Sequence, residues 1–128
     1  MRLTGYNILI VDDNMTFARS LSLMIRTILG DRLRRLDLAA NGKEAVELAH
    51  KVGYDMIFMD INMPEMNGIS ATKLINKNFY RTTVIIAVSY DKSIDSLSMM
   101  LESGARTMIY KDELTVESLE GVFDIRVS

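Results

Sequence analysis

The sequence predicts one α/β domain in which helices cover both faces of a parallel β-sheet, and three observations predict it. The chain has 128 residues, the size of a single ordinary domain, and 48% of them are hydrophobic. Short apolar runs rich in β-branched residues alternate with longer segments of helical period. The runs are mostly continuous, as expected of strands that are buried on both sides. We therefore expect residues 1–128 to form a single doubly wound domain of five β-then-α units.

The five predicted strands are the apolar runs at residues 7–11, 36–40, 56–59, 83–88 and 107–110. A single short run is easily misread, so the prediction depends on the alternation of all five with helical segments. Arg32, Arg34 and Arg35 fall between the first predicted helix and the second strand, where we expect a solvent-exposed connection.

The first two predicted helices carry apolar stripes at helical spacing. Asn14 is suited to cap the first helix and Gly30 to end it. Its stripe consists of Phe17, Leu21, Met24, Ile25 and Ile28. The stripe of the second helix consists of Ala45, Leu48, Ala49 and Val52.

Three more helices follow. The third, at about residues 69–76, is less sharply patterned. In the fourth, Ser93 is the expected cap and Gly104 the expected end, and the apolar stripe consists of Ile94, Leu97 and Leu101. In the fifth, which follows a Thr115 cap, the stripe consists of Val116, Leu119 and Phe123.

The composition excludes several classes of function. Fifteen Lys and Arg residues against seventeen Asp and Glu residues give a net charge of −2, which provides no general attraction for nucleic acid or membrane. The chain has no cysteine and only His50, so thiolate and multi-histidine metal sites are excluded. No apolar run approaches the roughly 18 residues of a membrane span, and the first run leads directly into Asp12 and Asp13. We expect a cytoplasmic protein.

Polar residues stand at the carboxyl ends of four of the five predicted strands. They are Asp12 and Asp13, Asp60, Ser89 and Lys111. Each has an ordinary structural explanation as a helix cap, a turn residue or a surface charge. Because the carboxyl ends of parallel strands meet at one edge, where open α/β sheets bind ligands, we expect the five side chains to converge.

Three carboxylates in one place repel one another and call for a counter-charge. A set of oxygen ligands without His or Cys selects Mg²⁺, or Mn²⁺, over zinc or copper. A carboxylate beside such a cation can act as the nucleophile in phosphoryl transfer, with Lys111 and Ser89 contacting the phosphoryl oxygens.

These residues resemble the receiver domain of two-component response regulators over essentially the whole chain. The most specific match is the segment MDINMPEMNG, in which Asp60 is followed by Met63, Pro64 and Gly68 as in the family loop. The acidic pair Asp12 and Asp13, Ser89 and Lys111 complete the family pattern.

The resemblance implies a flavodoxin-like sheet in the order 2-1-3-4-5 and a switch driven by phosphorylation. Asp60 would accept the phosphoryl group from a sensor histidine kinase or a phosphotransfer protein. Asp12, Asp13, Asp60 and the backbone carbonyl of Asn62 would hold the metal, with Asp12 acting mostly through bound water. Ser89 and Lys111 would bind the phosphoryl oxygens. The output would leave through the fourth helix, fifth strand and fifth helix, with no direct binding of nucleic acid by this domain.

Three positions depart from the common family pattern. Asp112 follows Lys111 where many members have a proline, a change that leaves the site intact. Met108 stands where the family usually has an aromatic switch residue, and Tyr90 stands where a small residue is usual. They give weight to a second hypothesis, a degenerate receiver that binds partners without phosphorylation. A third hypothesis is a phosphatase of the haloacid dehalogenase type. That type needs an aspartate two residues after the nucleophile, where this chain has Asn62.

Overall fold

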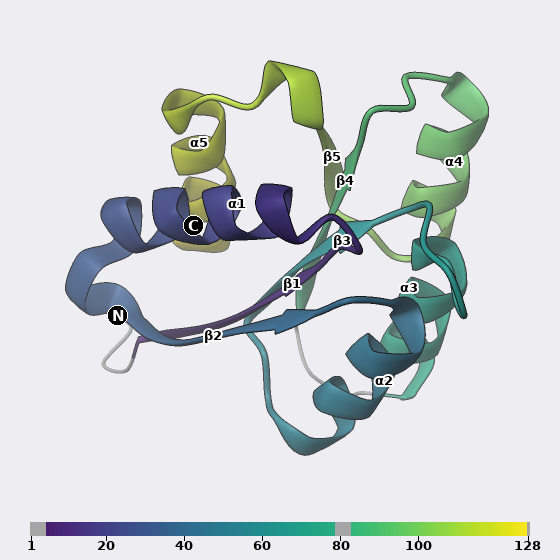
Figure 1. The fold of residues 1–128 in the computed structure, drawn as a ribbon, viewed down its shortest axis with the longest axis horizontal. Coiled ribbons are helices and arrows are strands. Elements are labelled where there is room, and N and C mark those ends of the chain that lie inside the picture. The colour runs from purple at the N-terminus through teal and green to yellow at the C-terminus, as the bar shows by residue number, and fades with distance from the viewer. Residues whose placement is uncertain (1–4, 79–82, 128) are drawn as a thin grey trace.

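The computed structural model describes residues 5–78 and 83–127, which form a five-stranded sheet between two layers of helices (Figure 1). All neighbouring strands are parallel and follow the order β2-β1-β3-β4-β5, as predicted. The strands are β1 (Tyr6–Val11), β2 (Leu33–Ala39), β3 (Met56–Asp60), β4 (Val84–Ser89) and β5 (Thr107–Tyr110).

Within the described residues, five α-helices alternate with the strands, and two short 3₁₀ turns, η1 (Gly30–Arg32) and η2 (Lys111–Glu113), follow α1 and β5. The helices are α1 (Met15–Leu29), α2 (Gly42–Lys51), α3 (Gly68–Asn78), α4 (Ile94–Ser103) and α5 (Val116–Val127). Helices α1 and α5 cover one face of the sheet, and α2, α3 and α4 cover the other (Figure 1). In the described part of the chain, no helix is long and apolar enough to cross a membrane.

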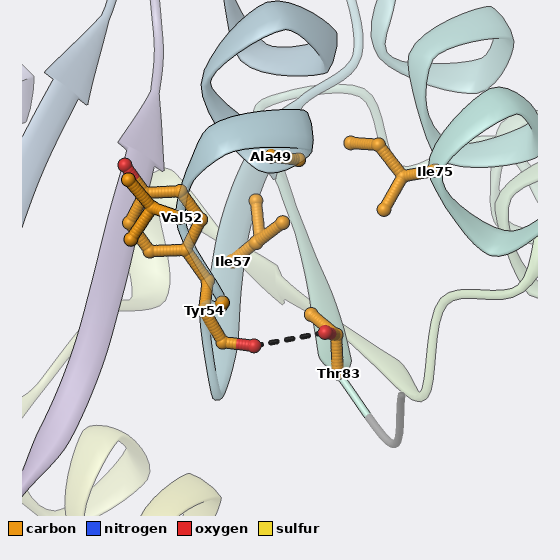
Figure 2. A pocket seen from close by; sticks show the side chains of 7 residues that line it. Ala49, Val52, Tyr54, Ile57, Ile75 and Thr83 are labelled. Carbon is orange, nitrogen blue, oxygen red and sulfur yellow. Dashed lines mark hydrogen bonds between the residues drawn. The ribbon is translucent and has the colours of Figure 1, made fainter. Parts of the chain in front are cut away.

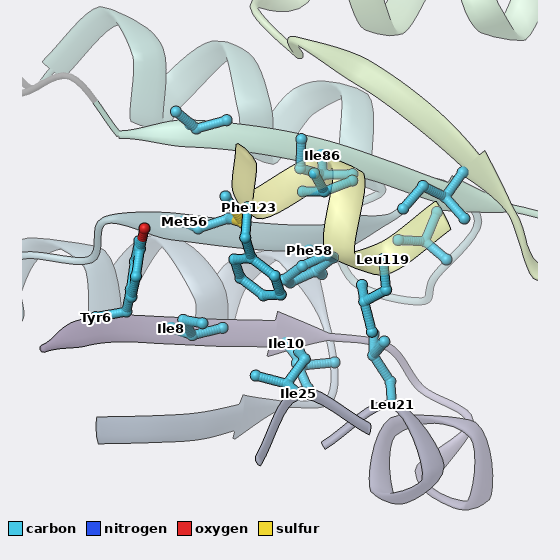
Figure 3. Packing of buried hydrophobic residues seen from close by; sticks show 14 of the residues in the cluster. Tyr6, Ile8, Ile10, Leu21, Ile25, Met56, Phe58, Ile86, Leu119 and Phe123 are labelled. Atoms are coloured by element: carbon cyan, nitrogen blue, oxygen red, sulfur yellow. The ribbon is translucent and has the colours of Figure 1, made fainter. Parts of the chain in front are cut away.

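Each face of the sheet has its own apolar core, because successive side chains of a strand point to opposite faces. In β1, Ile8 and Ile10 pack toward α1 and α5, whereas Leu9 packs on the opposite side. Phe123 of α5 lies in the centre of the first core (Figure 3). Its ring meets those of Tyr6 and Phe58 edge-on, at centroid distances of 5.8 and 6.3 Å.

The helix caps predicted from the sequence are confirmed. Asn14 Oδ1 accepts a hydrogen bond from the Phe17 N–H at the start of α1, and Ser93 and Thr115 side chains cap α4 and α5 in the same way. Gly30 and Gly104 end α1 and α4 with positive φ angles of 52° and 125°, which glycine adopts without steric strain.

The predicted connection around the arginine cluster is wrong. Strand β2 begins at Leu33, three residues earlier than predicted, so Arg34 and Arg35 lie inside the strand, and only Arg32 lies in the turn before it. Both strand arginines are nevertheless exposed, because β2 is an edge strand that pairs only with β1. Arg35 Nε donates to Asp37 Oδ2 at 2.8 Å. Charged residues are common on edge strands because they discourage pairing with other chains.

Two predicted core stripes are partly wrong. In α4, Ile94 and Leu101 are exposed by 78% and 44%, and the helix is anchored instead by the fully buried Met100. In α5, Val116 is exposed, whereas Leu119 and Phe123 are buried as predicted. Periodicity identifies the apolar side of a helix, but neighbouring elements decide how much of that side is covered. Helix α4 therefore leaves an apolar strip in solvent.

The central place of Phe123 in the core leads to a stability prediction. Phe123→Ala should lower the free energy of unfolding by about 3 to 5 kcal/mol, because it removes the ring that joins α5 to β1 and β3. Val116→Ala in the same helix should change it by less than about 0.5 kcal/mol, because Val116 is exposed. Urea denaturation measures both. Equal effects of the two substitutions would contradict this account of the core.

Candidate functional site

Three carboxylates meet at the carboxyl edge of the sheet, as the sequence predicts. Asp12 and Asp13 directly follow β1, and Asp60 is the last residue of the neighbouring β3. Each side chain offers an oxygen that lies within 4.8 Å of the other two. Asp12 and Asp60 are buried, and Asp13 is exposed. The cluster is therefore partly closed, with Asp13 on its open side.

Lys111, the first residue after β5, brings a buried ammonium group to the same cluster. Its Nζ lies 2.7 Å from Asp12 Oδ2 and 3.6 Å from Asp60 Oδ1, and its side chain is only 5% exposed. The Lys111 ammonium is thus the ion-pair partner of the buried Asp12 Oδ2. The other oxygen, Oδ1, accepts the Asn14 N–H at 2.9 Å. Asp12 thus joins Lys111 to the residue that caps α1.

One ammonium does not balance the charge of three carboxylates. Burial, followed by the negative charge of Asp12, raises the pKa of Asp60 to about 7, although Lys111 opposes the shift and Asp13 adds to it. In the absence of a cation, the cluster is therefore short of positive charge near neutral pH. A group with a perturbed pKa at the ligand-binding edge of an α/β sheet is a candidate functional residue.

The loop between β3 and α3 is held against the sheet edge at both of its ends. The Gly68 N–H donates to the Ile61 carbonyl at 2.8 Å, and the Gly42 N–H donates to the Met66 carbonyl at 3.0 Å. A Cβ atom on Gly68 would lie 2.0 Å from the Asp60 carbonyl oxygen, so only glycine permits this approach. The anchored loop carries the exposed Asn62 two residues beyond Asp60. The role of its carbonyl as a metal ligand stays a prediction.

Ser89 is the last residue of β4 and is buried beside the acidic cluster. Strand register places it one residue beyond Val88, the partner of Asp60, and opposite Tyr110, the residue before Lys111. Its Oγ accepts the Asp91 N–H at 2.9 Å. All five side chains that the sequence singled out therefore come from the same edge of the sheet.

Sequence reasoning noted Tyr90 beside Ser89 but missed the contact of two aromatic rings with Lys111. We predicted Phe17 only as a core residue of α1, but its ring centroid lies 4.6 Å from Lys111 Nζ. The ring of Tyr90, the residue after Ser89, lies 5.3 Å from the same nitrogen. Both distances are within the range of cation–π attraction. The sequence did contain one indication that Phe17 is near the site, because it lies about one helical turn beyond Asp13.

A small hollow lies at the opposite edge of the sheet and has different chemistry (Figure 2). Its lining includes Ala49, Ile57 and Ile75, and the Thr83 hydroxyl donates to the Tyr54 carbonyl at 2.8 Å beside it. No residue of its lining carries a carboxylate or an amine, so it offers nothing for phosphoryl or metal chemistry. The acidic cluster remains the candidate site.

The donor set of the acidic cluster fits a hard divalent cation. Its side-chain donors are carboxylate oxygens, and the shortage of positive charge there favours a cation over a neutral ligand. The buried Asp60 carboxylate also lies beside the Lys111 ammonium, and this pairing of a nucleophile with a positive charge suits phosphoryl transfer.

Comparison with known sequences agrees with this chemistry. The chain matches the response regulator receiver domain family over residues 8–121. It is 40% identical over 106 residues to the transcriptional regulatory protein YdfI of Bacillus subtilis, an overlap of 82% of this chain and 47% of that protein. A protein-glutamate methylesterase/protein-glutamine glutaminase of Aliivibrio fischeri is 39% identical over 105 residues, which are 81% of this chain and 27% of that protein. The chain thus spans less than half the length of these curated relatives.

Solved structures give the same result for the fold. The signal receiver domain of a DNA-binding response regulator from Colwellia psychrerythraea superposes with a TM-score of 0.85 at 26% identity, covering 96% of this chain and 98% of that one. The receiver domain of a sensor histidine kinase from Pseudomonas aeruginosa superposes with a TM-score of 0.83 at 27% identity, covering 97% and 98%. That structure contains a magnesium ion coordinated in the active site cleft.

The raised pKa of Asp60 predicts a pH-dependent stability. An acid with a higher pKa in the folded state than in the unfolded state binds its proton more tightly when folded, so it destabilises the fold increasingly as the pH rises from about 4 to about 7. In magnesium-free buffer, Asp60→Asn should therefore raise the free energy of unfolding by about 1 to 3 kcal/mol at pH 8 and hardly at all at pH 4. Urea denaturation at both pH values measures this difference. A gain of the same size at both pH values would contradict the raised pKa.

Proposed function

The chain belongs to the response regulator receiver domain family, and we propose that it is a signalling switch whose phosphoryl acceptor is Asp60. The observation that carries the proposal is the meeting of Asp60 with Asp12, Asp13 and Lys111 at one edge of the sheet. Receiver domains work with histidine kinases and output domains. A sensor histidine kinase or a phosphotransfer protein is therefore the proposed donor.

In the proposed reaction, a carboxylate oxygen of Asp60 attacks the phosphorus of a phosphohistidine. The new O–P bond forms as the P–N bond breaks, and the electron pair of that bond returns to the imidazole, which takes up a proton. The Lys111 ammonium, 3.6 Å from Asp60 Oδ1, is placed to stabilise charge on the phosphoryl oxygens. The buried Ser89 hydroxyl is the proposed hydrogen-bond donor to another of these oxygens.

The proposed cofactor is Mg²⁺, with Mn²⁺ as a possible substitute. The side chains of Asp12, Asp13 and Asp60 and the carbonyl of Asn62 would hold it. When bound, the cation offsets the carboxylate charge and withdraws electron density from the phosphoryl group. The magnesium in the superposable histidine kinase receiver supports this assignment.

A chain of hydrogen bonds supports a route from the site to helix α4. The Asp91 N–H donates to Ser89 Oγ, and the carboxylate of Asp91 accepts the Ser93 N–H at 2.8 Å and the Ser96 hydroxyl at 2.5 Å. If Ser89 turns toward a phosphoryl oxygen, its bond to Asp91 is released, and the start of α4 loses one of its restraints. Lys92 in the same loop is paired with Asp112 and Glu113 of η2, so the segment after β5 is linked to it.

We propose that the output face consists of α4, β5 and α5. The apolar strip of α4 supports this choice, because Ile94 and Leu101, which share one side of the helix, are 78% and 44% exposed. Met108 of β5 is half-buried and packs against the core below α2, α3 and α4. It has no hydroxyl with which to form a hydrogen bond in one state only, so we expect a smaller change there than in relatives with an aromatic residue.

In the proposed role, the protein is a regulator that catalyses only its own phosphorylation and dephosphorylation. The methylesterase relative is a much longer protein, and the segment that aligns with this chain is 27% of it. We do not assign an esterase activity or direct nucleic-acid binding to this domain, and we propose that it works in the cytoplasm. A receiver that acts without phosphorylation is the alternative that the following experiments distinguish.

The first experiment tests the acceptor. Incubation with Mg²⁺ and phosphoramidate should add one acid-labile phosphoryl group to the wild type and none to Asp60→Asn, as measured by intact mass. Asp13→Ala keeps the acceptor but removes a proposed metal ligand, so its labelling should be at least about tenfold slower. Equal labelling of the wild type and Asp60→Asn would remove Asp60 from the role.

A second experiment tests the output face by methyl NMR. Binding of beryllofluoride with Mg²⁺, which imitates the acyl phosphate, should shift the methyl signals of Ile94, Leu101 and Met108. Leu23 is a control on α1 whose side chain is 67% exposed, and its signal should stay unchanged. If changes occurred only in the loops around Asp13 and Asp60, the receiver would be better described as a phosphorylation-independent binding module.

A further inference from the structure

The ammonium group of Lys111 is enclosed by two aromatic rings as well as by carboxylates. Phe17 of α1 contributes a ring 4.6 Å from Nζ, and Tyr90 of the β4–α4 loop contributes one at 5.3 Å. The lysine side chain is 5% exposed. An aromatic face attracts a cation without carrying a charge of its own. The rings therefore hold the ammonium without neutralising it and without competing for its proton.

The two rings are held in different ways. Phe17 packs against the apolar core beneath α1 and α5, which fixes its position independently of the site. Tyr90 is 61% exposed, so burial in the core does not fix the position of its ring. Its contact with Lys111 is therefore the interaction that best accounts for the place of this ring, at the solvent side of an otherwise buried amine.

The position of the ammonium matters for the reaction at Asp60. Nζ is closer to Asp12, at 2.7 Å, than to Asp60, at 3.6 Å, yet the new negative charge would develop on a phosphoryl group bound to Asp60. A charged group stabilises a transition state best when it is already in place. A ring that keeps Lys111 from turning into solvent therefore contributes to catalysis through the lysine.

We propose that Tyr90 is a positioning residue whose ring face holds the Lys111 ammonium at the phosphorylation site. The inference deepens the proposed function and rests on Asp60 as the acceptor. Tyr90 also occupies space near the site, and a purely steric effect on donor access would be the alternative. A leucine is smaller and has no π face, so relief of crowding would speed labelling whereas loss of the contact would slow it. A phenylalanine keeps the face and removes only the hydroxyl.

The test compares Tyr90→Phe with Tyr90→Leu in the whole chain. With phosphoramidate and Mg²⁺, Tyr90→Phe should be labelled within about twofold of the wild-type rate, and Tyr90→Leu roughly fivefold more slowly. A rate for Tyr90→Leu equal to or above that of Tyr90→Phe would overturn the proposal in favour of simple bulk. Because Tyr90 is exposed, neither substitution should disturb the fold, and thermal unfolding checks this.

A second measurement needs no phosphoryl donor. The ε-methylene signals of Lys111 should lie upfield in the wild type and in Tyr90→Phe because of the ring current, and should move downfield in Tyr90→Leu. Unchanged signals in Tyr90→Leu would show that the ring does not hold the lysine. A wild type that takes no label at Asp60 would instead refute the proposed function, and with it the effect on rate, even if the ring-current shift were present.

Discussion

The candidate site depends on one ion pair, in which the buried ammonium of Lys111 lies 2.7 Å from the carboxylate of Asp12. Two buried carboxylates would be costly to place together at the edge of an apolar sheet without a counter-charge. Lys111 supplies only one positive charge, and the pKa of Asp60 stays raised. The fold thus tolerates the cluster while leaving it short of positive charge, which is the condition that favours a divalent cation.

The same ion pair joins parts of the chain that are far apart in sequence. Asp12 is tied through Oδ1 to the Asn14 N–H at the start of α1, and Lys111 begins the turn after β5. Phe17 and Tyr90 add contacts from α1 and from the loop that leads to α4. A change of charge at Asp60 therefore alters the electrostatic potential at groups on several elements. A switch of the proposed kind also requires that the phosphoryl group interact differently with two states of these elements.

Most of the fold and the central site residues could be predicted from the sequence, because they depend on local rules. Buried parallel strands are continuous apolar runs, and their carboxyl ends meet at one edge, which brings Asp60 and Lys111 together. The start of β2 was missed because an edge strand tolerates arginines. The outward side of α4 was missed because Ile94 has the same helical spacing whether or not a neighbour covers it. The pKa of Asp60 and the ring of Tyr90 over Lys111 depend on tertiary distances that no local pattern contains.

The central claim is that the carboxylate cluster lacks positive charge and that a divalent cation supplies it. Its most direct test is the carboxyl ¹³C chemical shift of Asp60, followed as a function of pH with and without Mg²⁺. The account predicts a pKa of about 7 without the cation and a much lower pKa when the cation is saturating. A pKa near the ordinary aspartate value of about 4 under both conditions would contradict it.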